Sequence, residues 1–229
     1  MKKQLLLAAG FAVIMLLSCK KEEEPPTAKF WPLVEGNRWT TAESYSWKAA
    51  SFADSSKSTT TNTVELREER EDGKLVWPVA TTTQGDSVIY SRSYYYVTED
   101  SIYIYSMDKD AEEPTAVEPN NLEVGTEWDG KLAIPVEIPN FSTTFPAHFK
   151  VTGRETVTVP AGSFNCLVVR LDIDNNGTTL DSAAVQWRAE GIGIVKFTTD
   201  FKTQYSMPPL PPVQVEVHGI SEMQSKTGF

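Results

Sequence analysis

The sequence is poor in the residues that most often carry catalysis or bind metal ions. Among its 229 residues there are two histidines and two cysteines. His148 and His218 lie far apart in the chain, and neither has the ligand spacing of a zinc site. The Gly-x-Ser-x-Gly elbow of hydrolases and the glycine-rich loops that bind phosphate are also absent. The sequence therefore predicts no catalytic residues, no metal ion and no cofactor.

Long apolar runs are confined to the N-terminus. Met1-Lys2-Lys3 precedes an apolar run from Leu5 to Leu17, which is shorter than the roughly 20 residues of a membrane-spanning helix. The run ends in Leu16-Leu17-Ser18-Cys19, which resembles a bacterial lipobox. The resemblance implies cleavage before Cys19 and a diacylglycerol on its thiol, so we expect a signal peptide at residues 1–18 and a membrane anchor made of acyl chains. A plain secretory peptide that contains a cysteine is the alternative.

Basic residues are outnumbered by acidic ones, 21 against 31, and the formal net charge is −10 at pH 7. An acidic chain repels phosphates, so we exclude nucleic acid as a partner. Residues 19–29 combine charges with Pro25-Pro26 and no apolar period, as a flexible tether does.

Within this tether, Lys20-Lys21-Glu22-Glu23-Glu24 resembles the acidic export signal of surface lipoproteins of the Bacteroidota. A merely solvated tether is the alternative. We expect a lipid-anchored protein of the outer membrane that meets the lipoprotein processing and export machinery. Exposure on the cell surface is left open.

Lipidation of Cys19 would also exclude an intramolecular disulfide, because Cys166 would then be the remaining thiol. Cys166 lies in an apolar stretch, where a free cysteine usually behaves as a small buried hydrophobe. The sequence predicts an inert thiol there.

Helical periodicity is lacking, whereas alternation with a period of two recurs along the chain. The longest patterned stretch is Val151 to Phe197, in which Pro160-Ala161-Gly162 and Asp174-Asn175-Asn176-Gly177 supply turns between successive strands. Such short connections predict an antiparallel meander. Further strands are expected within residues 38–47, 61–67, 75–83, 87–98, 101–107 and 213–217.

The remaining stretches are expected to be irregular. Ala49 to Thr60 is either a long loop or an exposed edge, with room for one short helix at Ala49–Ser56. Asp108 to Asn121 is predicted to be a loop and Asp129-Gly130 a turn. Pro135, Pro139 and Pro146 favour an irregular extended path, and Met207 to Pro212 a polyproline-like one. We predict one all-β domain at residues 30–229, an antiparallel meander that forms a curved sheet, an open barrel or a half-barrel.

Three short segments look familiar together. They are Pro32-Leu33-Val34-Glu35-Gly36-Asn37-Arg38-Trp39, Val159-Pro160-Ala161-Gly162-Ser163-Phe164-Asn165-Cys166, and Trp187-Arg188-Ala189-Glu190-Gly191-Ile192-Gly193-Ile194-Val195-Lys196. They resemble a group of bacterial lipoproteins and periplasmic domains of unknown function, some of which look related to lipoprotein-carrier β half-barrels. The resemblance implies a fold and no catalytic residues. Many members have an aromatic residue at the position of Arg188, which puts a ligand contact there in doubt.

Aromatic residues are the one group that suggests a binding site. Their rings combine a large apolar area with a polar edge, which suits sugars and apolar ligands alike. Ordinary packing within a sheet is the alternative. The candidate ligand-binding residues are Trp39, Tyr45, Trp47, Tyr94, Tyr96, Tyr103 and Tyr105.

Three functions remain after these exclusions. The first is a non-enzymatic lipoprotein that binds a small apolar or glycan ligand, or a partner protein, on an aromatic-rich sheet. The second is a structural or assembly accessory of the cell envelope without a small ligand. A hydrolase is the third, because two of 31 acids could form a catalytic pair although nothing in the sequence marks them.

Overall fold

The structure, a computed structural model, describes residues 26–50, 52–134, 144–175, 178–205 and 213–229, and the predicted signal peptide, Cys19 and Met207–Pro212 lie outside these ranges. The described residues form strands and connections without a helix. The strands are β1 (Arg38–Ala49), β2 (Phe52–Val64), β3 (Glu68–Glu69), β4 (Leu75–Gln84), β5 (Val88–Val97), β6 (Ser101–Ser106), β7 (Ala116–Pro119), β8 (Glu127–Ala133), β9 (Thr144–Val159), β10 (Gly162–Asn175), β11 (Thr178–Ala189), β12 (Gly193–Tyr205) and β13 (Val213–Thr227). The all-β prediction is confirmed.

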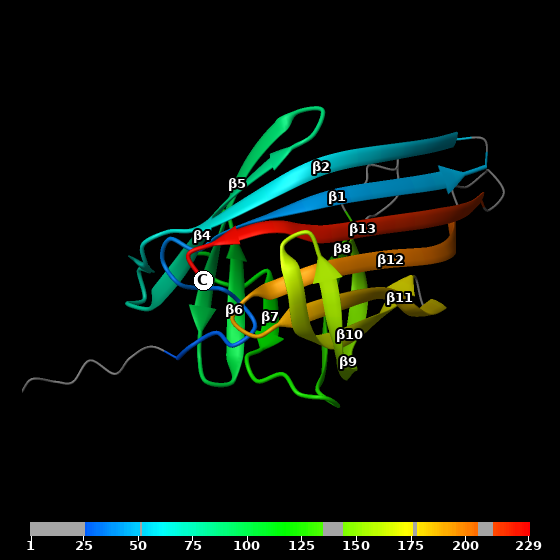
Figure 1. The fold of residues 1–229 in the computed structure, drawn as a ribbon. Coiled ribbons are helices and arrows are strands. Elements are labelled where there is room, and N and C mark those ends of the chain that lie inside the picture. Colours follow the sequence, from blue (N-terminus) through cyan, green and yellow to red (C-terminus); the bar gives the residue numbers. More distant parts are fainter. Residues whose placement is uncertain (1–25, 51, 135–143, 176–177, 206–212) are drawn as a thin grey trace, which may run out of the picture.

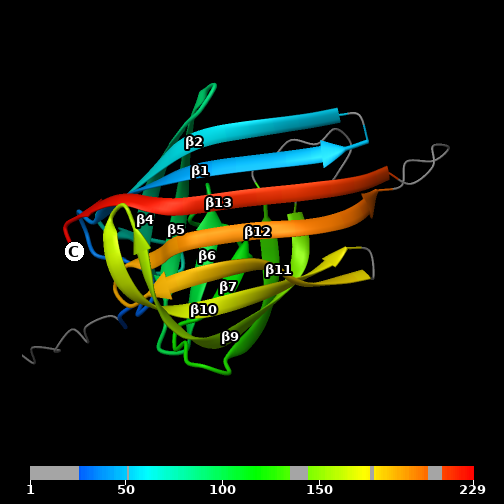
Figure 2. The ribbon, with the colours of Figure 1, turned by 45° about the vertical axis from the view of Figure 1, so that its right-hand side comes forward.

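One antiparallel sheet holds these strands in the order β7-β6-β5-β4-β2-β1-β13-β12-β11-β10-β9-β8, with the short β3 paired to β4 outside this path. Most neighbours are also neighbours in sequence, so the meander is confirmed. In Figure 1, β2, β1, β13 and β12 run as a long band, while β6 and β7 cross behind it at a steep angle. Figure 2 shows β9 and β10 as strongly curved strands that continue the sheet beyond β11. The sheet wraps into an almost closed barrel.

The barrel has one unsealed seam. Its two edge strands, β7 and β8, follow each other in the chain and contact each other without pairing. An open barrel was one of the forms that the sequence predicted, and it is the form observed.

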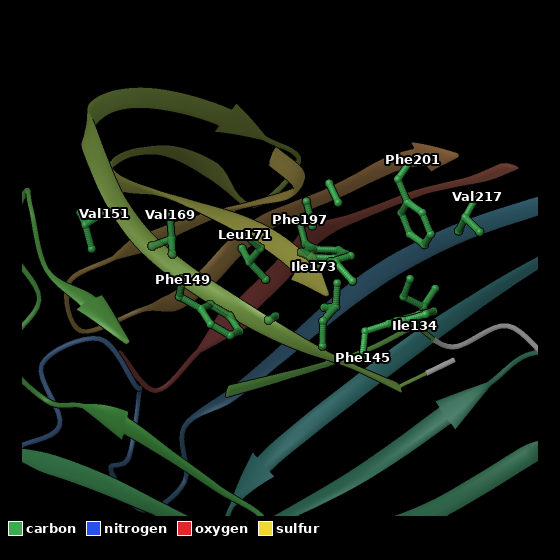
Figure 3. Packing of buried hydrophobic residues seen from close by; sticks show 14 of the residues in the cluster. Ile134, Phe145, Phe149, Val151, Val169, Leu171, Ile173, Phe197, Phe201 and Val217 are labelled. Carbon is green, nitrogen blue, oxygen red and sulfur yellow. The ribbon is translucent and has the colours of Figure 1, made fainter. Parts of the chain in front are cut away.

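Two clusters of buried apolar residues fill the interior. Alternate side chains of a strand share a face, so every second residue of β9 to β13 points inward. Figure 3 shows the first cluster, in which Phe145, Phe149, Leu171, Phe197 and Phe201 meet from β9, β10 and β12. The second cluster, near the other end of the long band, includes Trp39, Val64, Tyr95, Ile102, Val195 and Met223.

Two predictions of irregular structure were wrong, and a third was right in one of its alternatives. Of the stretch Ala49 to Thr60, residues 52–60 lie in β2 with no helix, and residues 52–57 are exposed and pair with β1 alone, as the exposed-edge alternative predicted. Ala116–Pro119, placed in a predicted loop, is the edge strand β7. Pro146 lies within β9. The pairing of β9 with β10 ends at the next residue, Ala147, so the missing N–H of Pro146 removes no hydrogen bond between these two strands.

The turn predicted at Asp129-Gly130 was wrong for a different reason. Gly130 lies in the middle of β8, and an added Cβ would lie 3.1 Å from Cε2 of Phe149. This glycine therefore serves a close approach across strands rather than a turn. The sequence alone does not distinguish these two uses of glycine.

Contacts of the domain begin before Phe30, within the stretch predicted to be a tether. Ala28 and Phe30 are buried. The backbone N–H of Gly191 donates to the Lys29 carbonyl at 2.7 Å, and Asn120 Nδ2 donates to the Thr27 carbonyl at 3.0 Å. The chain thus enters the barrel through specific hydrogen bonds to β11–β12 and to the residue after β7.

Gly219 of β13 is required by the ring of Tyr45. An added Cβ at Gly219 would lie 2.3 Å from Cδ1 of Tyr45 and 2.9 Å from Cγ2 of Thr199. Gly219→Ala is expected to cost about 1–3 kcal/mol of unfolding free energy, because the buried ring has to move. Urea denaturation measures this loss.

Gly153→Ala in β9 is the matched control, since nothing lies within 4 Å of its added Cβ. It should change the unfolding free energy by no more than about 0.5 kcal/mol. Removing the ring with Tyr45→Ala should abolish most of the extra cost of Gly219→Ala. Equal losses of unfolding free energy for Gly219→Ala and Gly153→Ala in the wild-type background would contradict a clash between the added methyl group and the Tyr45 ring.

Candidate functional site

An interior cavity of about 280 Å³, partly open to solvent, lies where the two apolar clusters meet. It is bounded by β1, β2, β5, β8, β11, β12 and β13 and by the N-terminal segment before β1. Its volume is just below the roughly 300–1,000 Å³ of pockets for drug-sized ligands. The lining consists of Trp31, Pro32, Trp39, Thr41, Glu43, Tyr45, Thr60, Asn62, Tyr95, Leu132, Ala133, Gln186, Ile192, Gly193, Ile194, Lys196, Phe197 and Ser221.

One side of this cavity is polar, which is unusual for the inside of a barrel. We call it the polar wall: the lining residues Thr41, Glu43, Thr60 and Asn62, together with Ser58, which lies outside the lining opposite Glu43 on the same face of the paired strands β1 and β2. Hydrogen bonds extend it to β4, from Thr60 Oγ1 to Thr83 Oγ1 at 3.0 Å and from Thr81 Oγ1 to Asn62 Oδ1 at 2.8 Å. These side chains are half-buried and hydrogen-bond to one another and to β4, so they present a polar surface to one side of the cavity.

Glu43 is the charged centre of the polar wall. Its carboxylate accepts long hydrogen bonds from Thr41 and Ser58, each at 3.4 Å. Burial raises the pKa of Glu43 above the ordinary value of 4.5, and the hydroxyls of Thr60, Thr41 and Ser58 oppose this shift only in part. Burial, with a smaller contribution from the Glu43 charge, also raises the pKa of Tyr45. The site therefore holds a half-buried carboxyl group.

Aromatic rings face this charge from several elements. Trp31 and Tyr95 pack with ring centroids 5.1 Å apart. Trp39 and Tyr45 flank the polar positions on β1, and Phe197 lies in the same row as Glu43, two strands away. Burial raises the pKa of Tyr95. An apolar surface thus adjoins the carboxylate.

Arg188 lies outside the lining and contacts it through Gln186. This fully buried residue donates to Glu118 Oε2 at 2.7 Å and to Gln186 Oε1 at 2.7 and 2.9 Å. Its guanidinium carbon lies 5.8 Å from the ring centroid of Trp31, whose Nε1 also donates to Glu118. The charge of Arg188 is therefore neutralised by Glu118, and the acceptor of Gln186 is occupied.

The predicted aromatic residues fall into two groups. Trp39 and Tyr45 line the cavity, and Trp47 follows them on the same face but packs against the first cluster. Tyr94, Tyr96, Tyr103 and Tyr105 form a separate cluster with Val76 on the other face of β5 and β6. Arg92, Lys74 and Arg70 lie over Tyr94, Tyr96 and Tyr105 at 5.3, 5.4 and 4.2 Å from the ring centroids. The seven residues do not form one platform.

Sequence reasoning missed Glu43, Trp31, Tyr95 and Gln186 as lining residues. One signal was available, because Glu43 stands in the alternating row Trp39, Thr41, Glu43, Tyr45, Trp47, where an acid among inward-facing aromatics is out of place. Alternation along the strand also predicts that Tyr95 points to the face of β5 opposite to that of its neighbour Tyr94. Gln186 and Trp31 reach the cavity only through tertiary packing.

The thiol and the histidines lie apart from this cavity. Cys166 is buried, and burial raises the pKa of its thiol to about 11, which agrees with the predicted inert thiol. His148 and His218 pair with Asp129 and Asp200 on the surface. Among the described residues no group of three or more metal-ligating side chains is assembled. No helix within the described ranges has the length and apolarity to cross a bilayer.

Comparison with known proteins gives a partial family match. A family model described as DUF3108-like matches residues 147–203, from within β9 to within β12. This is less than half of the chain, and it includes two of the three segments that look familiar in the sequence. None of the curated proteins matches the chain.

Two solved structures show a remote likeness. One is a candidate exported protein with a YmcC-like fold from Bacteroides fragilis, 15% identical with a TM-score of 0.49, and the match covers 88% of this chain and 100% of the other. The second is a candidate lipoprotein from Parabacteroides distasonis, 13% identical with a TM-score of 0.41 over the same shares. Both likenesses are too remote to carry an argument about function.

The raised pKa of Glu43 predicts a pH-dependent stability. Its folded-state pKa lies above that of the unfolded chain, so its contribution to stability falls as the pH rises from about 4.5 through the raised pKa. Glu43→Gln removes this loss. Its melting temperature should exceed that of the wild type at neutral pH, and the difference should shrink as the pH is lowered toward about 4.5.

Glu216→Gln is a control with the opposite sign. Its hydrogen bond with Lys202 lowers the pKa of Glu216, so the wild-type residue contributes above the ordinary pKa and loses that contribution on acidification. Melting curves recorded across this pH range compare the two variants. A Glu43→Gln variant that is less stable than the wild type at neutral pH would contradict a costly buried charge.

Proposed function

We propose that this chain is an exported, lipid-anchored, non-enzymatic binding protein that holds a small ligand inside its barrel. The observation that supports binding is the cavity of about 280 Å³ in which a polar wall faces aromatic rings. Polar groups that fix orientation beside apolar surface that excludes water are the usual composition of a ligand site. The interior, rather than the outer tyrosine cluster, is the proposed binding surface.

The lining supports binding over hydrolysis. Glu43 is the acidic residue among the described lining residues, whereas glycoside hydrolysis normally requires two carboxyl groups about 5–10 Å apart. The thiol of Cys166 is buried away from the lining and is protonated at neutral pH.

A substitution that fills the cavity tests ligand binding. Thr60→Phe places a ring in the lining, and Thr59→Phe places the same ring on the exposed outer face of β2. Screening fragment-sized compounds by the change in tryptophan fluorescence, to which Trp31 and Trp39 of the lining contribute, should reveal ligands of the wild type. Thr60→Phe should weaken their binding at least about tenfold, and Thr59→Phe should leave it unchanged. Ligands that bind all three proteins equally would contradict an interior site.

The anchor is proposed from the N-terminal sequence. A chain that ends its apolar run in Leu16-Leu17-Ser18-Cys19 is expected to be lipidated at Cys19 and placed in the outer membrane. Labelled palmitate should enter the wild type and Cys166→Ala but not Cys19→Ala. Palmitate in the Cys19→Ala variant would contradict the anchor, and protease treatment of intact cells would distinguish the two leaflets.

A further inference from the structure

We propose that the ligand of the interior cavity is a small organic cation, an amine whose ammonium group binds Glu43 while its apolar body packs on the aromatic rings. This inference rests on the proposed function, since it names the class of ligand for the same site. Three features carry it: the charge balance of the lining, the free acceptor capacity of Glu43, and the position of the rings.

The charge balance of the lining leaves Glu43 uncompensated. Lys196, the lysine of the lining, has its Nζ 2.8 Å from Glu222 Oε1. Arg188, behind Gln186, is neutralised by Glu118 at 2.7 Å. No ion pair of Glu43 exists among the described residues within 4.0 Å. The net charge that a ligand meets is therefore negative, which favours a cation and disfavours a carboxylate or phosphate.

The hydrogen bonds of Glu43 leave room for such a cation. An ionised carboxylate has about four acceptor positions. Three hydroxyl groups reach that of Glu43, those of Thr41 and Ser58 at 3.4 Å each and that of Thr60, so one position remains for a further donor. Hydroxyl groups moderate the charge without neutralising it. An ammonium group donates up to three hydrogen bonds and forms shorter, charge-assisted ones with a carboxylate.

The neighbouring rings suit the rest of the ligand. Trp39 and Tyr45 occupy the inward positions on either side of Thr41 and Glu43 along β1, and Trp31 packs against Tyr95 with the two rings tilted by 48°. Aromatic faces attract cations within about 6 Å and also bury apolar groups. At about 280 Å³ the cavity admits one small ring with a short chain. Gln186 Oε1 is already engaged by Arg188, so the amide is not a competing acceptor.

Three probes of matched shape test the charge. Phenethylamine carries the ammonium group, phenethyl alcohol is its neutral counterpart, and phenylacetate is an anion. Calorimetric titration of the full mature chain at neutral pH should show that phenethylamine binds at least about tenfold tighter than phenethyl alcohol and that phenylacetate binds weakest. Glu43→Gln should abolish the preference for the amine and keep the binding of the alcohol.

Two controls keep the outcomes distinct. Glu216→Gln, which removes a carboxylate paired with Lys202 outside the lining, should retain the preference for the amine. Equal binding of amine and alcohol by the wild type, or a preference that survives Glu43→Gln, would overturn the cationic ligand while leaving the binding function standing. If none of the three probes binds the wild type, and no fragment from the screen binds Thr60→Phe more weakly than the wild type, then both the cationic ligand and the interior binding site are wrong.

Discussion

An ion pair between Arg188 of β11 and Glu118 of β7 joins two strands that the order of the sheet keeps far apart. The edges of the sheet, β7 and β8, contact each other without pairing, so backbone hydrogen bonds do not close the barrel there. The side chains of Arg188 and Glu118 are 2% and 14% exposed, and the loss of one partner would leave a poorly solvated charge. Trp31 adds a hydrogen bond to Glu118, which ties the N-terminal segment to the same closure.

The cavity follows from this mode of closure. The first apolar cluster lies mainly between β8 and β13, and the second joins the N-terminal segment, β1, β2 and β4–β6 to one end of β9–β13. Between them, Arg188 and Gln186 occupy space that apolar side chains would otherwise take, and the polar wall lies on β1 and β2. Half-buried hydroxyl and carboxyl groups cannot collapse onto apolar neighbours without a loss of hydration. The polar groups that keep the cavity open therefore also favour a ligand that can hydrogen-bond to them.

The fold was more predictable from the sequence than the site. Alternation along residues 151–197 and turn residues such as Pro160-Ala161-Gly162 act locally, so they predict strands and their antiparallel pairing. Local signals failed where tertiary contacts decide, as at Gly130, which admits the ring of Phe149, and at Pro146, which lies where β9 lacks a partner in β10. Trp39 and Tyr45 were found by their type, whereas Trp31 and Gln186 are brought to the cavity by packing between segments far apart in sequence.

A crystal structure of the purified protein tests the central claim most directly, because it shows what occupies the space between Glu43 and the aromatic rings. Ordered water or a bound molecule within hydrogen-bonding distance of the Glu43 carboxylate, with Arg188 paired to Glu118, is the predicted result. Side chains that meet across the interior and leave the Glu43 carboxylate turned outward into solvent would contradict it.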